Sequence, residues 1–207
     1  MKLSFKNNTF FYLLYGCFLI IGLISYLRIP KGAEITYCYQ HYNTYSNLFF
    51  KNITYFGEFY FAVIFGIYLY FKRRNFLNFA MSAWIGQLLL SKFFKLLIDA
   101  PRPLTFFKGV YSFDLVDGVQ PLFHQSLPSG HASMAFCTCC LISFFVKDYM
   151  LKFALFALAV AVGISRVYLI CHFKEDVVLG SINGVFCATI AVYFYNYSIS
   201  KNTSTLH

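Results

Sequence analysis

Three short polar strings interrupt an otherwise apolar sequence, and their residue types suit the binding and transfer of a phosphate group. In chain order they are Lys95 with Arg102-Pro103, then Pro128-Ser129-Gly130-His131, then Ser165-Arg166 with His172 and Asp176. Together they supply cations, two histidines, a carboxylate and a glycine-containing turn. Polar side chains are costly to keep in lipid-soluble sequence, so a functional role is the default expectation.

The third string predicts a histidine nucleophile. His172 and Asp176 are four residues apart, so on a helix they share one face. A carboxylate paired with one imidazole nitrogen fixes the tautomer and leaves the other nitrogen free to attack. The plainer alternative is a salt bridge, or a helix-dipole partner in Asp176. That alternative gives no reason for Arg166 in the same string.

The first string predicts cationic contacts to phosphate. Lys95 and Arg102 are about two helical turns apart, and the prolines on both sides of Arg102 end the helix. The planar guanidinium suits two phosphate oxygens, while the lysine acts as a point charge. Snorkelling of both side chains toward lipid headgroups is the alternative.

The second string predicts an anion site at the start of a helix. Free backbone N–H groups and the positive end of the helix dipole attract anions there. Ser129 caps the helix or donates to a phosphate oxygen, and Gly130 lets the backbone approach closely. His131 is then placed to give a proton to a departing oxygen. A plain helix cap with an interfacial histidine is the alternative.

Composition predicts an integral membrane protein with a single domain over residues 1–207. Of the 207 residues, 59% are hydrophobic and only 12% are charged, whereas soluble domains average about 25% charged residues. A net charge of +9 is also typical of proteins that bind nucleic acid. However, the cations lie at the ends of apolar runs, where they anchor helices. We therefore expect the bilayer, and no nucleic acid, as partner.

Six apolar stretches predict an all-α bundle of six transmembrane helices, near residues 9–27, 53–71, 76–97, 131–146, 151–170 and 176–197. The stretches are continuous rather than alternating, which favours helices over a barrel. We expect the first to be an uncleaved helix, because the small residues of a signal cleavage site are missing near Arg28-Ile29-Pro30. The long connection from Asp99 to Ser129 is rich in aromatic residues and is either a lid over a lipid headgroup or a plain loop.

The positive-inside rule predicts the orientation of the helices. With a cytoplasmic N-terminus, the cytoplasmic segments contain eight basic residues and one acidic residue, Asp148, whereas the other segments contain nine basic and seven acidic residues. The eight basic residues are Lys2, Lys6, Lys72, Arg73, Arg74, Lys147, Lys152 and Lys201. Both termini are then cytoplasmic, and all three polar strings lie at the extracytoplasmic face.

Most of the seven cysteines lie in apolar segments. Cys137, Cys139 and Cys140 lack a second ligand pair at zinc-site spacing, so we interpret them as small hydrophobic residues. Cys38 and Cys171 could meet outside the membrane, and the sequence leaves their pairing open.

The three strings resemble the signature of the type 2 phosphatidic acid phosphatase superfamily, shared with vanadium haloperoxidases and glucose-6-phosphatases, and every fixed position matches. The resemblance implies a metal-independent phosphatase with a phosphohistidine intermediate and no cofactor. It implies that His172 is the nucleophile, Asp176 orients it, and His131 is the general acid. The residues implied to hold the phosphate oxygens are Lys95, Arg102, Ser129, Gly130 and Arg166.

The resemblance also implies a phosphorylated lipid as substrate and a place in a bacterial inner membrane. The candidates are lipid A phosphates, undecaprenyl pyrophosphate and phosphatidylglycerol phosphate, because the motif residues contact only the phosphate. Two alternatives are a lipid phosphotransferase that uses the same phosphohistidine and a non-catalytic lipid-binding protein. The oligomeric state is left open.

Overall fold

The computed structural model describes residues 2–204, and they form helices with no strand. The prediction of an all-α fold is therefore confirmed over this range. The helices are α1 (Thr9–Arg28), α2 (Ala33–Gln40), α3 (Thr44–Ile53), α4 (Phe59–Lys72), α5 (Arg74–Ile98), α6 (Pro103–Phe106), α7 (Gly130–Ser143), α8 (Tyr149–Tyr168) and α9 (Lys174–Ser204). Two 3₁₀ turns, η1 (Lys6–Asn8) and η2 (Thr54–Gly57), precede α1 and α4.

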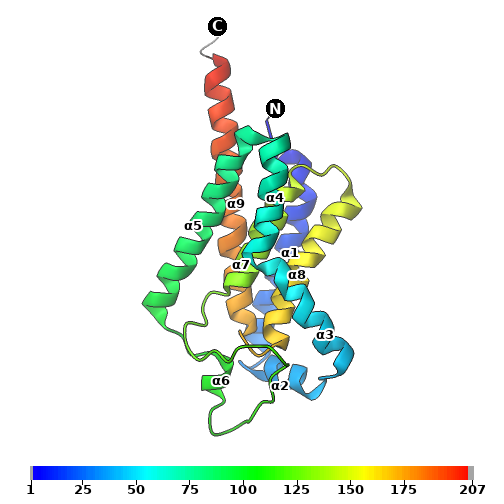
Figure 1. The fold of residues 1–207 in the computed structure, drawn as a ribbon, viewed down its shortest axis with the longest axis vertical. Helices are drawn as coiled ribbons and strands as arrows, with labels where there is room; N and C mark the ends of the chain where they lie inside the picture. Colours follow the sequence, from blue (N-terminus) through cyan, green and yellow to red (C-terminus); the bar gives the residue numbers. More distant parts are fainter. Residues whose placement is uncertain (1, 205–207) are drawn as a thin grey trace.

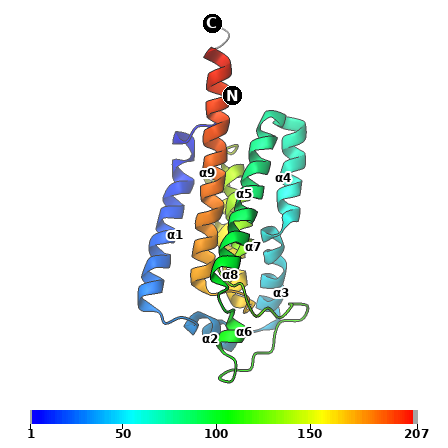
Figure 2. The ribbon, with the colours of Figure 1, turned by 90° about the vertical axis from the view of Figure 1, so that its left-hand side faces the viewer.

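Helix α7 forms the core of the bundle and packs against α5, α8 and α9 (Figures 1 and 2). Almost all of its side chains are buried, including those of Cys137, Cys139 and Cys140. The three cysteines thus pack as small hydrophobic residues. With 14 residues, α7 is about 21 Å long at the usual helical rise. This is shorter than the roughly 30 Å of hydrocarbon in a bilayer.

The expected count of six spanning helices is not confirmed. Four described helical segments are long and apolar enough to cross a membrane, and they contain α1, α5, α8 and α9. A fifth is obtained if α3, η2 and α4 are counted as one bent span. The remaining apolar helix is α7, which is too short by this measure.

The expected span at residues 53–71 is broken in the structure. The segments Thr44–Gly57 and Phe59–Lys72 are bent by 48° where they meet. Gly57 lies at the break, and a Cβ atom there would lie 2.9 Å from the Cβ of His131 and 2.7 Å from Val162. The chain therefore approaches α7 and α8 more closely than a side chain allows.

Helices α7 and α9 pack at close range through Gly180 and Gly184. A Cβ atom at these positions would overlap the carbonyl oxygens of Ser129 and Ser133, respectively. Between the two glycines, Asn183 Nδ2 donates to Ser133 Oγ at 2.9 Å, and also to Ser91 Oγ and the Gln87 carbonyl of α5. Small residues and an amide thus join three helices, as is common inside membranes.

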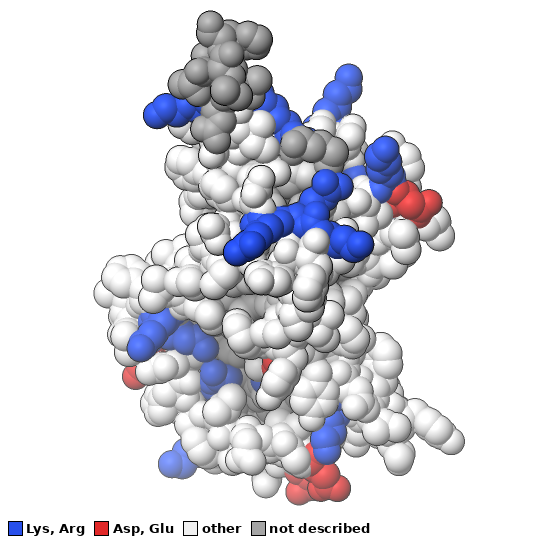
Figure 3. Space-filling model, turned by 45° about the horizontal axis from the view of Figure 1, so that its top comes forward, with Lys and Arg blue, Asp and Glu red and all other residues white. Residues whose placement is uncertain are grey.

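The termini and the polar strings lie at opposite ends of the bundle. Figure 1 shows both chain ends at the top, with α2, α6 and the long connection at the bottom. In Figure 3, many Lys and Arg side chains gather on the half that carries the termini, where few acidic groups are seen. The relative placement of termini and motifs is as the sequence predicts. Helices α2 and α3, which the hydropathy pattern does not predict, fill the motif end between α1 and η2.

Candidate active site

A tight turn after α8 positions His172. Ile170 adopts a left-handed conformation with φ of 57°, which is unusual for a β-branched residue. The turn lets the backbone N–H groups of Cys171 and His172 both donate to the Arg166 carbonyl, at 2.9 and 3.1 Å. The imidazole of His172 is thereby fixed at the end of α8, with only 2% of the residue exposed.

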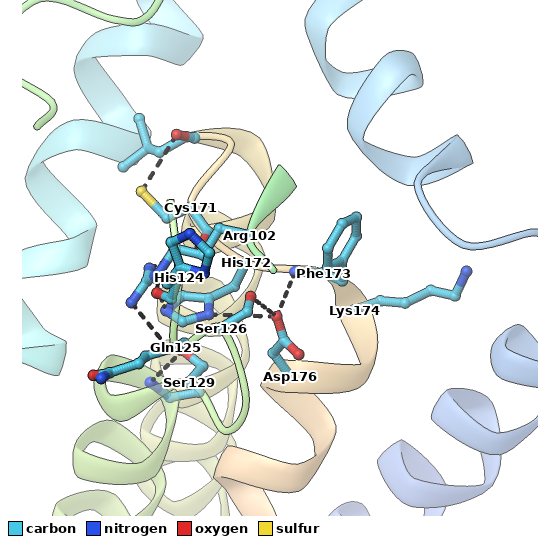
Figure 4. A network of polar contacts seen from close by, with 12 residues as sticks. Arg102, His124, Gln125, Ser126, Ser129, Cys171, His172, Phe173, Lys174 and Asp176 are labelled. Atoms are coloured by element: carbon cyan, nitrogen blue, oxygen red, sulfur yellow. Dashed lines mark hydrogen bonds and ion pairs between the residues drawn. The ribbon is translucent and has the colours of Figure 1, made fainter. Parts of the chain in front are cut away.

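The contacts of the His172 ring define its tautomer (Figure 4). Nε2 lies 3.2 Å from Nη1 of Arg102, and Nδ1 lies 3.5 Å from Oδ2 of Asp176. Because a guanidinium only donates hydrogen bonds, Nε2 must carry the lone pair and Nδ1 the proton. The distance to Asp176 is long for a hydrogen bond, as is common at catalytic sites without substrate. This tautomer presents Nε2 as a nucleophile.

Asp176 is held by three groups besides His172. Its Oδ2 accepts hydrogen bonds from Ser126 Oγ at 2.5 Å and from the backbone N–H of Phe173 at 2.9 Å. Its backbone carbonyl accepts from the N–H of Ser129, also at 2.9 Å. Asp176 therefore ties the third string to the second. Ser126 is fully buried, and sequence reasoning missed it because its only signal is its place just before the second string.

The long connection holds Arg102 in place. The guanidinium donates to the carbonyl oxygens of His124 at 2.7 Å, Gln125 at 3.3 Å and Cys171 at 3.0 Å. Pro103 begins α6 directly after it, as expected for proline at a first helical position. The connection is therefore more than a plain loop, because it positions the Arg102 side chain. Its aromatic residues also pack there, with the rings of Phe106 and Phe173 5.4 Å apart.

The second string forms the N-terminus of α7. Ser129 caps the helix, since its Oγ accepts from the N–H of Ala132 at 3.5 Å. No heavy atom lies within 4 Å of where a Cβ atom of Gly130 would be. The space beside Gly130 is therefore open, as the close approach of an anion to the start of the helix would need.

The structure brings all eight candidate residues together. Lys95 is within electrostatic reach of Arg102, Arg166 and Asp176, and its ammonium forms no hydrogen bond or ion pair with the described residues. His131 is within electrostatic reach of His172 and of all three cations. The full set is Lys95, Arg102, Ser129, Gly130, His131, Arg166, His172 and Asp176.

Two further polar residues reach the site from the break between η2 and α4. Arg166 Nη1 donates to Thr54 Oγ1 at 2.8 Å, and Oε1 of Glu58 lies 3.8 Å from Nε2 of His131. Sequence reasoning missed both, because the hydropathy pattern placed them in or beside a continuous helix. Their polarity within an apolar run was the only available signal.

The remaining polar groups near the third string have structural contacts. The ammonium of Lys174 lies 3.1 Å from Oε2 of Glu34 and 2.8 Å from the Ile29 carbonyl, which joins the start of α9 to the α1–α2 link. Cys38 and Cys171 are both free thiols within one apolar cluster. No group of three His, Cys, Asp or Glu side chains that could hold a metal ion occurs in the part of the chain described.

The burial of His172 predicts a pH-dependent stability. Burial lowers the pKa of His172 to about 4, although Asp176 acts in the opposite direction. An unfolded histidine has a pKa of about 6.5, so below that pH the unfolded state binds a proton that the folded state does not. The free energy of unfolding should then fall as the pH drops from about 6.5 to about 4, by up to roughly 3 kcal/mol.

Thermal unfolding in detergent at pH 4.5 and pH 7 measures this effect. We expect the apparent Tm of the wild type to fall more on acidification than that of His172→Gln, which lacks the titrating group. Parallel pH dependences of the two proteins would show that His172 does not titrate in this way.

The apolar helical bundle thus gathers three cations and a buried His–Asp pair at one end. The chain belongs to the PAP2 superfamily, whose profile matches residues 76–200. The match includes all three strings, so the resemblance to the type 2 phosphatidic acid phosphatases is confirmed.

Two solved structures share this fold. LpxE from Aquifex aeolicus has a TM-score of 0.68 at 25% identity, covering 77% of this chain and 92% of its own. The PAP2-type phosphatidylglycerolphosphate phosphatase from Bacillus subtilis has a TM-score of 0.66 at 25% identity, covering 94% of this chain and 96% of its own. No curated protein sequence matches the chain significantly. The apolar helices and these neighbours identify an integral membrane protein.

Proposed function

We propose that this protein hydrolyses a phosphate ester or pyrophosphate of a membrane lipid through a phosphohistidine intermediate, without a metal ion. The observation that carries the proposal is the arrangement around His172. Its Nδ1 faces Asp176 and its Nε2 faces a guanidinium, within a cluster of three cations. Phosphoryl transfer needs mainly positioning and charge stabilisation, and this arrangement supplies both.

The reaction then has two steps. His172 Nε2 attacks phosphorus, a P–N bond forms, and the P–O bond to the lipid breaks while His131 protonates the departing oxygen. Water then attacks phosphorus with His131 as base, so that a P–O bond forms and the P–N bond breaks. Lys95, Arg102 and Arg166 stabilise the charge on the other phosphate oxygens in both steps. The contact between Arg102 and Nε2 gives way to a phosphate oxygen when substrate binds.

A lipid is supported as the substrate by an apolar cavity beside the second string. The cavity has a volume of about 270 Å³ and is lined by Leu127 and Pro128 together with residues of α5 and α9. Both helices are membrane-span candidates. The cavity therefore offers an acyl chain a place next to Ser129 and Gly130, reached from within the bilayer.

Phosphatidylglycerolphosphate is the first candidate, because it is the substrate named for the Bacillus subtilis neighbour. Lipid A phosphates and undecaprenyl pyrophosphate are the other candidates. The distribution of Lys and Arg supports cytoplasmic termini and an extracytoplasmic site. The two bacterial neighbours support a bacterial inner membrane as the setting.

Phosphate release by the detergent-purified protein tests the proposal. We expect release from at least one of the three lipid phosphates in the presence of EDTA. Release that requires added Mg²⁺ would overturn metal independence. Transfer of the phosphate to a second lipid, without release, would identify a phosphotransferase, and no reaction with any lipid would favour a binding protein.

A further inference from the structure

The break between η2 and α4 forms a wall of the site that the three strings do not supply. Gly57 lies directly against the backbone and Cβ of His131. Before Gly57 in the chain, Thr54 accepts a hydrogen bond from Arg166. Directly after Gly57, the carboxylate of Glu58 faces the His131 ring. Two motif residues therefore contact a segment that lies outside the motifs.

Glu58 is free to act on His131. The residue is extended, with φ of −93° and ψ of 170°, and occupies the N-cap position of α4, yet its side chain makes no capping hydrogen bond. Its Oε1 lies 3.8 Å from Nε2 of His131, and the two side chains are 33% and 31% exposed. Both groups thus lie at the open side of the site, where a departing lipid oxygen would leave.

The surroundings of His131 explain why a carboxylate beside its ring would help catalysis. Burial disfavours an imidazolium at His131, and the nearby cations Arg166, Lys95 and Arg102 disfavour it further. A general acid must nevertheless carry a proton when the lipid oxygen departs. Asp176 is engaged with His172, Ser126 and Phe173. Glu58 is the carboxylate that faces His131 itself.

We propose that Glu58 is a positioning residue that orients the His131 ring and favours its protonated form, the imidazolium that gives a proton to the departing lipid oxygen. This inference rests on the proposed function, in which His131 is the general acid. Glu58 does not touch the phosphate and forms no covalent bond. Its effect should therefore depend on how much the departing oxygen needs a proton.

The dependence on the leaving group separates this role from a merely structural one. An alkoxide departs poorly unless it is protonated, whereas a nitrophenolate departs readily without a proton. We expect Glu58→Gln to lower kcat/KM for a lipid alkyl phosphate by at least about tenfold, since general acid catalysis contributes 10² or more. The same variant should lower kcat/KM for nitrophenyl phosphate by less than about threefold. Glu58→Asp, which keeps the carboxylate, should recover part of the alkyl phosphate activity.

A double-mutant cycle tests whether Glu58 acts through His131. His131→Ala should show the same preference for the aryl substrate, and Glu58→Gln should cost nothing further in the His131→Ala background. Asp148→Asn is the control, because it removes an exposed carboxylate at the opposite end of α8, where an asparagine can keep the N-cap hydrogen bond from the Leu151 N–H. We expect this control to leave both activities unchanged.

The outcomes distinguish the inference from the function on which it rests. Equal losses of kcat/KM for both substrates in Glu58→Gln, or losses that add to those of His131→Ala, would overturn the proposed role. Glu58 would then only line the site. Unchanged activity in Glu58→Gln would do the same. An inactive wild type, or a fully active His131→Ala, would instead contradict the proposed function.

Discussion

Replacing His172 by alanine is expected to lower phosphate release by at least about a thousandfold, because removal of an enzyme's nucleophile leaves only binding and charge stabilisation. The ring is buried, with its tautomer defined by Arg102 and Asp176. No other imidazole in the described residues has this pair of neighbours. The measurement is the initial rate of release in EDTA from the best lipid of the panel.

The covalent intermediate gives a second measurement of the same step. Rapid quenching with a radiolabelled substrate should trap label on the wild type that is stable in alkali and lost in acid, as expected of a phosphohistidine. The His172→Ala protein should carry none. His41→Ala is the control, because His41 is exposed and the one hydrogen bond of its ring is with the Tyr37 carbonyl. More than a tenth of wild-type activity in His172→Ala would exclude this residue as the nucleophile.

Gly184→Ala is expected to destabilise the bundle and to reduce activity without changing any polar group. The added Cβ would overlap the Ser133 carbonyl and lie 2.9 Å from the backbone nitrogen of Cys137. These are backbone atoms, which cannot rotate away as a side chain can. Helices α7 and α9 must therefore move apart. Overpacking of this kind costs about 1–3 kcal/mol or more. Because α7 begins at Gly130 and carries His131, its displacement also disturbs the site.

Gly16→Ala provides the matched comparison. Gly16 also lies in a membrane-spanning helix, but nothing lies within 4 Å of its added Cβ atom. We expect the apparent Tm of Gly16→Ala to equal that of the wild type or to exceed it slightly, because alanine has the higher helix propensity. Similar values of Tm and activity for the two alanine variants would argue against close contact between α7 and α9.

The amino-acid sequence determined the class of fold and the members of the candidate site. Backbone groups in lipid require internal hydrogen bonds, so the long apolar runs had to be helices. A phosphate site needs cations, a helix start and a nucleophile, and these residue types are readable from three strings. Gly180 and Gly184 are four residues apart in an apolar run, a spacing typical of closely packed membrane helices, and the carbonyls of Ser129 and Ser133 lie against them.

Only the tertiary structure showed what holds the candidate site together. A hydropathy window averages over about 19 residues, so it did not register the break at Gly57. Ser126 is 50 residues from Asp176, and Thr54 is 112 residues from Arg166. Such contacts join positions whose local sequence carries no sign of one another. They exist because helix packing places the break, the long connection and the start of α9 around one buried histidine.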